Sequence, residues 1–278
     1  MERIPLFRKL LIEIHSDCNR RCFFCSRTWD NTGRRLLADG TRVVRSMPTE
    51  HVLRIMDEAA GMGFRGAVGF HQWNEPFMDP RLIELAWEAR KRGLAPYVHT
   101  NGDLLRKNHP LCRQAAEVFG EVTVGLYDAT SALSRATEKT FWRQRLRGTK
   151  VRFSLMKNVF PRAIAPYDER MCRKQRAYPS SPCHEPELRL VIHYNGNMSL
   201  CCEDLWEEFG LGNAFETSVH DLWHSEAHTR ILQDLRAGRR ANYRLCSRCP
   251  HPHRPWRQAL GTAVRALLGR RAGVVSPP

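Results

Sequence analysis

Three cysteines lie close together near the start of the chain, in the segment DCNRRCFFC from Asp17 to Cys25. Their spacing is C-x3-C-x2-C, and no fourth cysteine follows nearby. A zinc site needs four ligands, or three and a water, whereas three thiolates can bind three irons of a four-iron cluster. Cys18, Cys22 and Cys25 therefore predict an iron–sulfur cluster in which one iron is open to another molecule.

A second group of cysteines lies in the last third of the chain. It comprises Cys183, Cys201 and the C-x2-C pair Cys246 and Cys249. Four thiolates complete the coordination of a second cluster, and a structural zinc site with the same ligands is the alternative. The chain has ten cysteines and no signal of secretion, which indicates metal or redox ligands before disulfides.

The elements that must position these cysteines alternate between strand and helix. Short apolar runs predict strands over residues 9–15, 66–71, 95–100, 121–127 and 150–156. Helical spacing and capping residues predict helices over 47–63 and 79–93, a helix that follows the third strand and runs to about 118, and a helix over 130–147. Strands separated by single helices form a parallel sheet. The predicted fold class is α/β, a partial (β/α) barrel of about five or six units with a small α+β cluster-binding domain.

Polar loops follow the ends of these strands. The three-cysteine loop follows the first strand, and HQWNEP, HTNGD and YDA follow the next three. Because ligands bind at the carboxyl ends of parallel strands, these loops predict a site on one rim. His71 and Tyr127 lie at this rim, where each either lines the pocket or packs in the core.

The C-terminal part of the chain changes character. We predict a barrel over 1–160, a proline- and arginine-rich linker over 161–182, a cluster domain over 183–255 and a basic tail over 256–278. Within the third segment, the Asn-Gly pair of ELRLVIHYNGNMSLCCE predicts a hairpin. A helix is predicted over about 219–238, with Ser218 as its N-cap.

Composition limits the classes of partner. The chain has 278 residues and a formal net charge of +15, which favours an anionic substrate or partner, although a genome that prefers arginine would give the same charge. The arginine-rich stretch 143–176 lacks interleaved aromatic residues, so nucleic acid is not expected as a partner. No run of 18 apolar residues and no signal-peptide pattern occurs, so we expect a cytoplasmic protein without a membrane segment.

The pattern C-x3-C-x-aromatic-C after the first strand of a partial barrel resembles the radical S-adenosylmethionine (SAM) superfamily, over about residues 8–160. The resemblance implies that Cys18, Cys22 and Cys25 hold a [4Fe–4S] cluster whose open iron binds SAM. It implies reductive cleavage of SAM to a 5′-deoxyadenosyl radical, which abstracts hydrogen from a substrate. It also implies a flavodoxin- or ferredoxin-type electron donor.

Further positions match the SAM-binding segments of this superfamily. WNEPF matches the segment that usually reads Gly-Gly-Glu-Pro, with Asn74 in place of the second glycine. HTNG resembles the end of the third strand, which approaches SAM, and Phe24 matches the aromatic residue beside the adenine. The SAM-binding residues implied by the resemblance are Phe24, Asn74, Glu75, Pro76, Thr100, Asn101 and Tyr127.

The second cysteine set resembles the auxiliary-cluster domain called SPASM, in its one-cluster form called twitch. No cysteine follows Cys249, so the resemblance implies one auxiliary [4Fe–4S] cluster on Cys183, Cys201, Cys246 and Cys249. The spacings resemble those of twitch dehydrogenases that oxidise an aminocyclitol alcohol. The main prediction is an oxidoreductase that acts on a small molecule, with the auxiliary cluster as electron acceptor. The alternatives are a peptide-modifying enzyme that crosslinks or epimerises, and a non-catalytic iron–sulfur or zinc protein.

Three residues are candidate catalytic groups. Cys202 is a candidate hydrogen-atom donor or acid/base group, with a buried structural thiol as the alternative. Asp204 is a candidate base, with a solvated carboxylate as the alternative. Arg162 lies in the predicted linker, where the resemblance implies an arginine facing the substrate.

Overall fold

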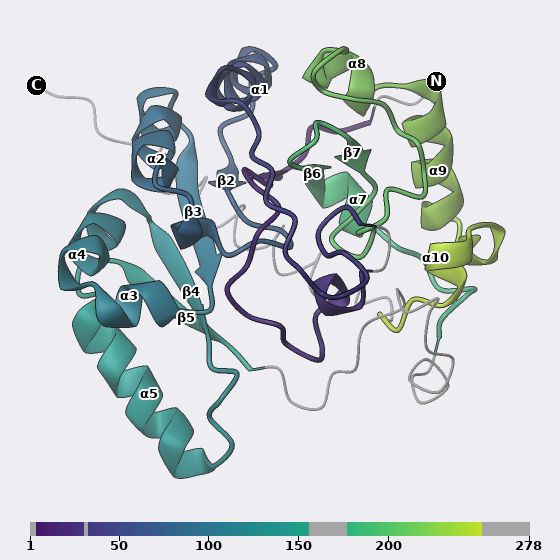
Figure 1. Ribbon diagram of the computed structural model, residues 1–278. Coiled ribbons are helices and arrows are strands. Elements are labelled where there is room, and N and C mark those ends of the chain that lie inside the picture. Colours follow the sequence, from purple (N-terminus) through teal and green to yellow (C-terminus); the bar gives the residue numbers. More distant parts are fainter. Residues whose placement is uncertain (1–3, 31–32, 156–176, 252–278) are drawn as a thin grey trace, which may run out of the picture.

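The fold is built on one seven-stranded sheet, shown in the computed structural model of the chain (Figure 1). The structure describes residues 4–30, 33–155 and 177–251. The strand order is β5-β4-β3-β2-β1-β6-β7, and every neighbouring pair is parallel except β6 and β7. The strands are β1 (Lys9–Ile12), β2 (Ala67–Gly69), β3 (Ala95–Thr100), β4 (Glu121–Gly125), β5 (Lys150–Ser154), β6 (Arg189–Ile192) and β7 (Met198–Ser199). The predicted α/β partial barrel is confirmed.

Helices lie along the outside of the curved sheet, and helix α1 shows why (Figure 1). Val52, Ile55, Met56 and Ala59 recur at helical spacing and are buried, so α1 packs one apolar face inward. The longer helices are α1 (Thr49–Gly61), α2 (Leu82–Lys91), α4 (His109–Val118), α5 (Ala132–Arg145) and α9 (Glu226–Arg236). The shorter ones are η1 (Ser26–Trp29), η2 (Pro76–Met78), α3 (Asp103–Lys107), α7 (Glu185–Leu188), α8 (Val219–Trp223), η3 (Arg240–Asn242) and α10 (Arg244–Ser247).

Two predicted helices are each divided in two by a polar capping residue. Between α3 and α4, Asn108 has an extended backbone, and its side chain accepts a hydrogen bond from the N–H of Leu111 at 3.0 Å. Between α8 and α9, Ser225 likewise accepts from the N–H of His228 at 3.3 Å. Such side chains start a new helix, because they satisfy N–H groups that lack a partner in the first turn. The prediction that Ser218 caps the first of these helices is confirmed.

The predicted hairpin forms, but it continues the barrel sheet. Strand β6 pairs with β1 in parallel, from Lys9 opposite Arg189 to Ile12 opposite Ile192. The turn between β6 and β7 contains Gly196 at a φ of +86°, which a residue with a side chain rarely adopts. The cysteine loop after β1 and the segment after β7 are therefore attached to one sheet, in which only β6 separates the two strands.

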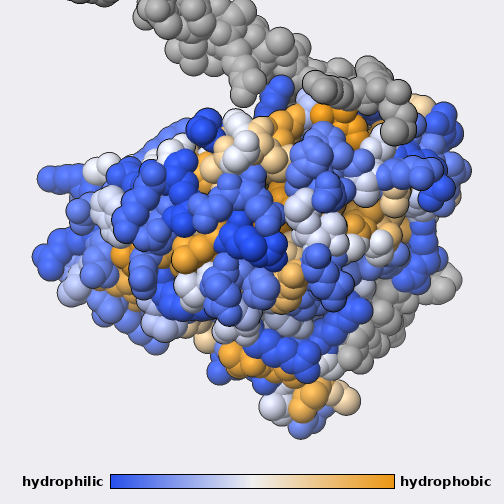
Figure 2. All heavy atoms as spheres, turned by 90° about the horizontal axis from the view of Figure 1, so that it is seen from above, coloured by the Kyte–Doolittle hydropathy of each residue, from blue (hydrophilic) through white to orange (hydrophobic). Residues whose placement is uncertain are grey.

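The core and the surface are separated in the usual way for a globular chain. One apolar core contains residues of both halves, including Leu10 and Ile12 of β1 and Leu190 and Ile192 of β6. On the face shown in Figure 2, hydrophilic side chains predominate and apolar ones form small separate patches. In the described part of the chain, no helix has the length and apolar character needed to cross a membrane.

Candidate active site

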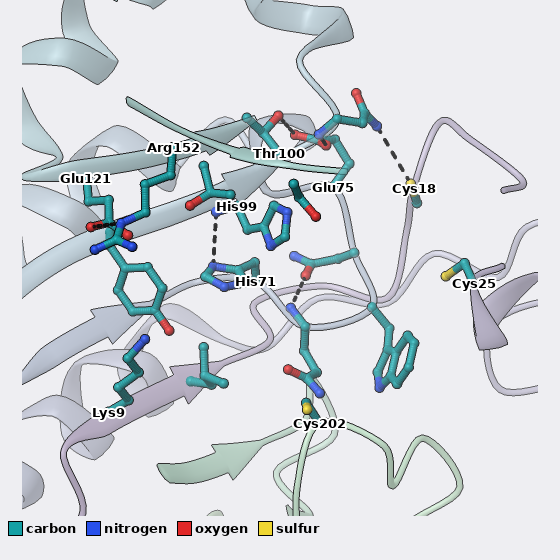
Figure 3. Close-up of a pocket in the computed structure, with 18 of the residues that line it drawn as sticks. Lys9, Cys18, Cys25, His71, Glu75, His99, Thr100, Glu121, Arg152 and Cys202 are labelled. Atoms are coloured by element: carbon teal, nitrogen blue, oxygen red, sulfur yellow. Dashed lines mark hydrogen bonds and ion pairs between the residues drawn. The ribbon is translucent and has the colours of Figure 1, made fainter. Parts of the chain in front are cut away.

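A cavity of about 910 Å³ lies on the inner face of the sheet. Figure 3 shows Cys18 and Cys25 at one end and Lys9, Glu121 and Arg152 at the other. His71, His99 and Glu75 lie between these ends, and Cys202 approaches from the C-terminal segment. The cavity therefore runs from the first cysteine group to the neighbourhood of the second.

The three cysteines of the first loop all line this cavity. The N–H of Cys25 donates to the carbonyl of Cys22 at 2.9 Å, which closes a tight turn. Burial, with a smaller effect from the nearby Cys25 thiol, raises the pKa of Cys18 to about 12 and that of Cys22 to about 11. A cationic metal centre would offset this effect and bind the three sulfurs as thiolates. The donor set therefore fits an iron–sulfur cluster with three protein ligands.

Charged residues hold the cysteine loop from both sides. Asp17, only 4% exposed, accepts from the N–H of Cys18 at 2.8 Å and forms ion pairs with Arg27 at 3.2 Å and Arg42 at 3.1 Å. On the other side, the guanidinium of Arg20 donates to both oxygens of Asp103, at 2.5 and 2.7 Å. The sequence reasoning missed these ion pairs, because their partners are distant in sequence and no spacing marks them.

Glu75 joins the two predicted SAM-binding segments. Its Oε1 accepts from the hydroxyl of Thr100 at 2.6 Å, and its Oε2 accepts from the N–H of Asn101 at 2.7 Å. The side chain of Asn101 then donates to Oδ1 of Asn19 at 2.7 Å, which reaches the cysteine loop. Burial raises the pKa of Glu75 to about 7. A buried carboxyl that several donors already orient suits a cationic group such as an ammonium.

The two residues beside Glu75 shape its loop. Oδ1 of Asn74 accepts from the N–H of Gln72 at 2.9 Å, and its Nδ2 donates to the carbonyl of Phe70 at 3.2 Å. The side chain of Asn74 thus stabilises this turn by two hydrogen bonds, at a position where the family pattern has glycine. Pro76 is buried at the start of η2 and is not among the residues that line the cavity. The geometry supports a structural role for Pro76 rather than direct contact with a ligand.

Aromatic side chains complete this end of the cavity. Phe24 and Tyr127 both line it, with ring centroids 5.0 Å apart and an edge-to-face orientation. Burial and the nearby thiols, first Cys22, raise the pKa of Tyr127, so its phenol stays neutral. Of the two alternatives for Tyr127, the structure places it in the cavity wall.

The second cysteine group gathers around the end of β7 and α10. Burial raises the pKa of Cys246, and the neighbouring thiols of Cys183 and Cys249 raise it further. Burial also raises the pKa of Cys201, with Cys246 among the contributing thiols. The nine cysteines in the described residues form no disulfide. Four thiols that lie close enough to shift one another's pKa fit the ligand set of a closed cluster.

The described residues contain no group of three or more His, Cys, Asp or Glu side chains that could hold a metal ion. That finding concerns a single ion. A four-iron cluster is larger than one zinc ion and holds its thiolates farther apart.

The three candidate catalytic residues differ in where they lie relative to the cavity. Cys202 lines the cavity. Asp204 is 1% exposed, accepts from the N–H groups of Leu200 at 3.2 Å and Glu208 at 2.9 Å, and is not part of the cavity wall. The expectation of a solvated carboxylate was therefore wrong, and Asp204 instead caps backbone groups of the auxiliary loop. Arg162 lies outside the described residues.

The far end of the cavity was missed by the sequence reasoning. Its residues come from alternate positions of the strands, which face the same side of the sheet. Strands of parallel sheets are usually apolar on both faces, yet β4 carries Glu121 and Thr123, and β5 carries Lys150, Arg152 and Ser154. The polar residues at every second position of β4 and β5 are the sequence signal that could have predicted a polar cavity on that face of the sheet.

A second missed feature is a buried ion-pair network behind the cavity. The guanidinium of Arg35 donates to both oxygens of Glu13, at 2.5 and 2.7 Å, and also contacts Nδ1 of His193 at 3.0 Å. Although burial raises it, the pKa of Glu13 is lowered by the charge of Arg35. Glu13 follows β1, His193 follows β6, and Arg35 follows the cysteine loop. The network therefore connects the two halves of the chain next to the site.

Two family models match this chain. The radical SAM superfamily model matches residues 12–158, and the model of the iron–sulfur cluster-binding SPASM domain matches residues 183–250. The S-adenosyl-L-methionine-dependent 2-deoxy-scyllo-inosamine dehydrogenase of Niallia circulans is 23% identical, over 88% of this chain and 93% of that protein. The tungsten-containing aldehyde ferredoxin oxidoreductase cofactor-modifying protein of Pyrococcus furiosus is 32% identical, over 34% of this chain and 24% of that protein.

Solved structures share the fold. The crystal structure of BtrN in complex with AdoMet and 2-DOIA has a TM-score of 0.71 and 21% identity, over 90% of this chain and 95% of that one. The structure of anSMEcpe with bound AdoMet has a TM-score of 0.56 and 11% identity, over 96% of each chain. At these identities the likeness establishes the fold.

Proposed function

Because this chain belongs to the radical SAM superfamily, we propose that it oxidises an alcohol group of a small molecule, with an auxiliary cluster as the electron acceptor. The observation that carries the proposal is the cavity, which is lined by Cys18, Cys22 and Cys25 at one end and by Cys202, next to auxiliary ligand Cys201, on another wall. A substrate in this cavity would lie between an open cluster and a closed one. The 23% identity to a 2-deoxy-scyllo-inosamine dehydrogenase supports the same reaction class.

The two cysteine groups divide the cofactors between them. We assign the SAM-binding [4Fe–4S] cluster to Cys18, Cys22 and Cys25, and the auxiliary [4Fe–4S] cluster to Cys183, Cys201, Cys246 and Cys249. When bound, the first cluster and SAM supply one-electron chemistry that removes a hydrogen atom from carbon. The residues of the chain bind and orient the reactants and exclude water.

Glu75 is proposed to bind the ammonium group of SAM. Its carboxyl is held by Thr100 and by the N–H of Asn101, so its orientation is set before a ligand arrives. Its pKa of about 7 falls when a cation approaches, which makes the carboxylate the bound form. The rings of Phe24 and Tyr127 offer an apolar surface beside the cysteine loop for the adenine.

His71 is proposed to orient the alcohol of the substrate. It lines the cavity, and its Nδ1 accepts from the N–H of His99 at 3.3 Å (Figure 3). Burial lowers the pKa of His71 well below its usual value, so the ring is neutral. The neutral ring then carries its proton on Nε2, where it is a hydrogen-bond donor. Cys202, and Arg162 outside the described residues, stay candidates for accepting the hydroxyl proton.

The electron donor is proposed to be an acidic protein of the flavodoxin or ferredoxin type. Phe23 lies between two cluster ligands in sequence and is 56% exposed, and Val44 is 61% exposed. The guanidinium of Arg21 lies against Gly40 in the neighbouring loop, which brings positive charge to this region. Exposed apolar side chains on segments that also carry a positive charge suit an acidic partner.

The proposal is tested by turnover under anaerobic conditions. Protein reconstituted with iron and sulfide, given SAM, a chemical reductant and a panel of cyclic and linear polyols, is expected to form 5′-deoxyadenosine and a carbonyl product in equal amounts. Mass spectrometry would show the product two hydrogens lighter than its alcohol. Formation of 5′-deoxyadenosine with no oxidation of any polyol would contradict the proposal and favour the peptide-modifying alternative.

A further inference from the structure

The end of the cavity away from the cysteine loop is rich in positive charge. Lys9, Lys150, Arg152 and Arg189 all line it, and Glu121 supplies the only carboxylate among the described residues of this end. Lys150 and Arg152 share one oxygen of that carboxylate, at 3.0 and 2.7 Å. Two cations thus pair with a single negative charge, which leaves an excess of positive charge.

Lys9 and Arg189 add to this excess from the neighbouring strands β1 and β6, where they lie opposite one another. The ammonium of Lys9 lies 5.0 Å from the ring centroid of Tyr97, and the described residues offer it no ion pair. Burial, and next the charge of Arg189, lower the pKa of Lys9. Arg189 does pair with Glu185, yet its Nε is buried without a hydrogen-bond partner among the described residues.

The positive charge of Arg189 has a second explanation, but this explanation does not apply to Lys9 or Arg152. The thiols of Cys202 and Cys201 are among the groups that raise the pKa of Arg189 against the effect of burial. Arg189 therefore lies near the auxiliary cysteines as well as at this end of the cavity, and a cluster there would share its charge. The groups that shift the pKa of Lys9 include no thiol, and Arg152 shares its carboxylate with Lys150. Lys9, Lys150 and Arg152 thus have one carboxylate of this end, that of Glu121, between them, and the cations outnumber it.

We propose that the substrate carries an acidic group, a carboxylate or a phosphate, which Lys9, Arg152 and Arg189 bind at this end of the cavity. Guanidinium and ammonium donors suit the oxygens of both groups. The carbon to be oxidised would then point past Glu75 toward the cysteine loop, at the opposite end (Figure 3). The inference rests on the proposed function for the reaction and adds the charge class of the substrate. An amine would place a like charge next to these residues and would be disfavoured.

Direct binding tests the inference without requiring turnover. The probes are an inositol monophosphate, a hexuronic acid, neutral myo-inositol and 2-deoxy-scyllo-inosamine, titrated calorimetrically into anaerobic holoenzyme that contains SAM. We expect at least one acid to bind about tenfold more tightly than the neutral and amine compounds, with an affinity that falls as salt is raised. The comparison of phosphate with carboxylate identifies the acidic group.

Variants then locate the binding site. Lys9→Met and Arg152→Gln should each weaken binding of the acid about tenfold, because each removes a charged donor. Lys91→Met and Arg90→Gln, on helix α2 and outside the residues that line the cavity, are the matched controls and should leave binding unchanged. Cluster absorbance and an unchanged affinity for SAM verify that each variant is folded.

Two results would overturn the inference. One is neutral or amine probes that bind as tightly as every acid, or no acid binding below about 10 mM. The other is acid binding that neither Lys9→Met nor Arg152→Gln weakens relative to the controls. Acid binding that responds to both variants without any alcohol oxidation would overturn the proposed reaction and keep the inference. If a neutral alcohol is oxidised, and neither Lys9→Met nor Arg152→Gln changes the rate, the proposed reaction is kept and the inference of an acidic substrate is overturned.

Discussion

At the scale of single residues, Glu75 shows how a position can be recognised by sequence while its chemistry depends on the fold. The motif marked Glu75, but the structure shows that its carboxyl is buried and held by Thr100 and Asn101. Burial raises its pKa to about 7, close to neutral pH. Its protonation should therefore be coupled to the binding of a cation.

Glu75 should make SAM affinity depend on pH. Below pH 7 its carboxyl is mostly protonated and must lose a proton to pair with the ammonium, so affinity should rise with pH and level off above about 7. Equilibrium binding from pH 6 to 8 measures the effect. Glu75→Gln should bind SAM at least about tenfold more weakly and without this slope. An unchanged slope in Glu75→Gln would assign the titration to another group.

Residue types also explain what the sequence reasoning could and could not predict about the site. Cys18, Cys22 and Cys25 were predictable because thiolates at that spacing serve few purposes. Lys9 and Arg152 were not, because a charged residue in a strand has no meaning until its neighbours are known. Asp204 was misjudged for the same reason, since its carboxylate caps N–H groups that only the folded loop presents.

At the scale of elements, the contact between β1 and β6 organises the molecule. Both strands are short apolar runs, and no local pattern indicates that they pair. Strand existence and order along the chain were predictable from periodicity, whereas this long-range pairing was not. The Arg35–Glu13 pair with His193 lies directly beyond the two strands and fixes them together.

Breaking this pair should destabilise the junction. Arg35→Met leaves the carboxylate of Glu13 buried without its cation, which should cost about 3–5 kcal/mol in the free energy of unfolding. The double variant Glu13→Gln/Arg35→Met should recover part of that loss. Denaturant unfolding of the apo-protein measures both. A single variant that loses less than about 1 kcal/mol would show that the pair contributes little.

The hairpin turn gives a second test at this scale. Gly196→Ala should destabilise the protein by about 1–3 kcal/mol, because the backbone has a φ of +86° and a Cβ would meet Asn213 and Phe215 at 2.4 and 2.7 Å. Gly61→Ala is the matched control, since a Cβ there meets nothing within 4 Å at the end of α1. It should be neutral or slightly stabilising in thermal unfolding. If both variants lose the same stability, the loss in Gly196→Ala is not due to strain at a positive φ.

At the scale of the whole molecule, one sheet joins the two halves of the chain, and its cavity reaches from the first cysteine group to Cys202, which is next to Cys201 of the second group. The partial barrel was predictable because alternating strand and helix signals allow few other arrangements. The way the C-terminal segment adds to the sheet was not predictable, and neither was the positive far end of the cavity. These features come from contacts between residues that are remote in sequence.

The two cysteine groups should be separable by iron content. Reconstituted protein should hold about eight irons per chain, and Cys246→Ala should hold about four. An iron assay with parallel zinc analysis measures both. About four irons and one zinc in the unmodified protein would assign the second group to structural zinc.

The central claim is that the three-cysteine group starts the reaction and the four-cysteine group accepts the electron. The most direct measurement is to quantify 5′-deoxyadenosine and oxidised product together in Cys18→Ala and Cys246→Ala. The account predicts neither compound from Cys18→Ala, and 5′-deoxyadenosine with little oxidised product from Cys246→Ala. SAM cleavage that persists in Cys18→Ala, or full oxidation in a Cys246→Ala protein shown to lack its second cluster, would contradict it.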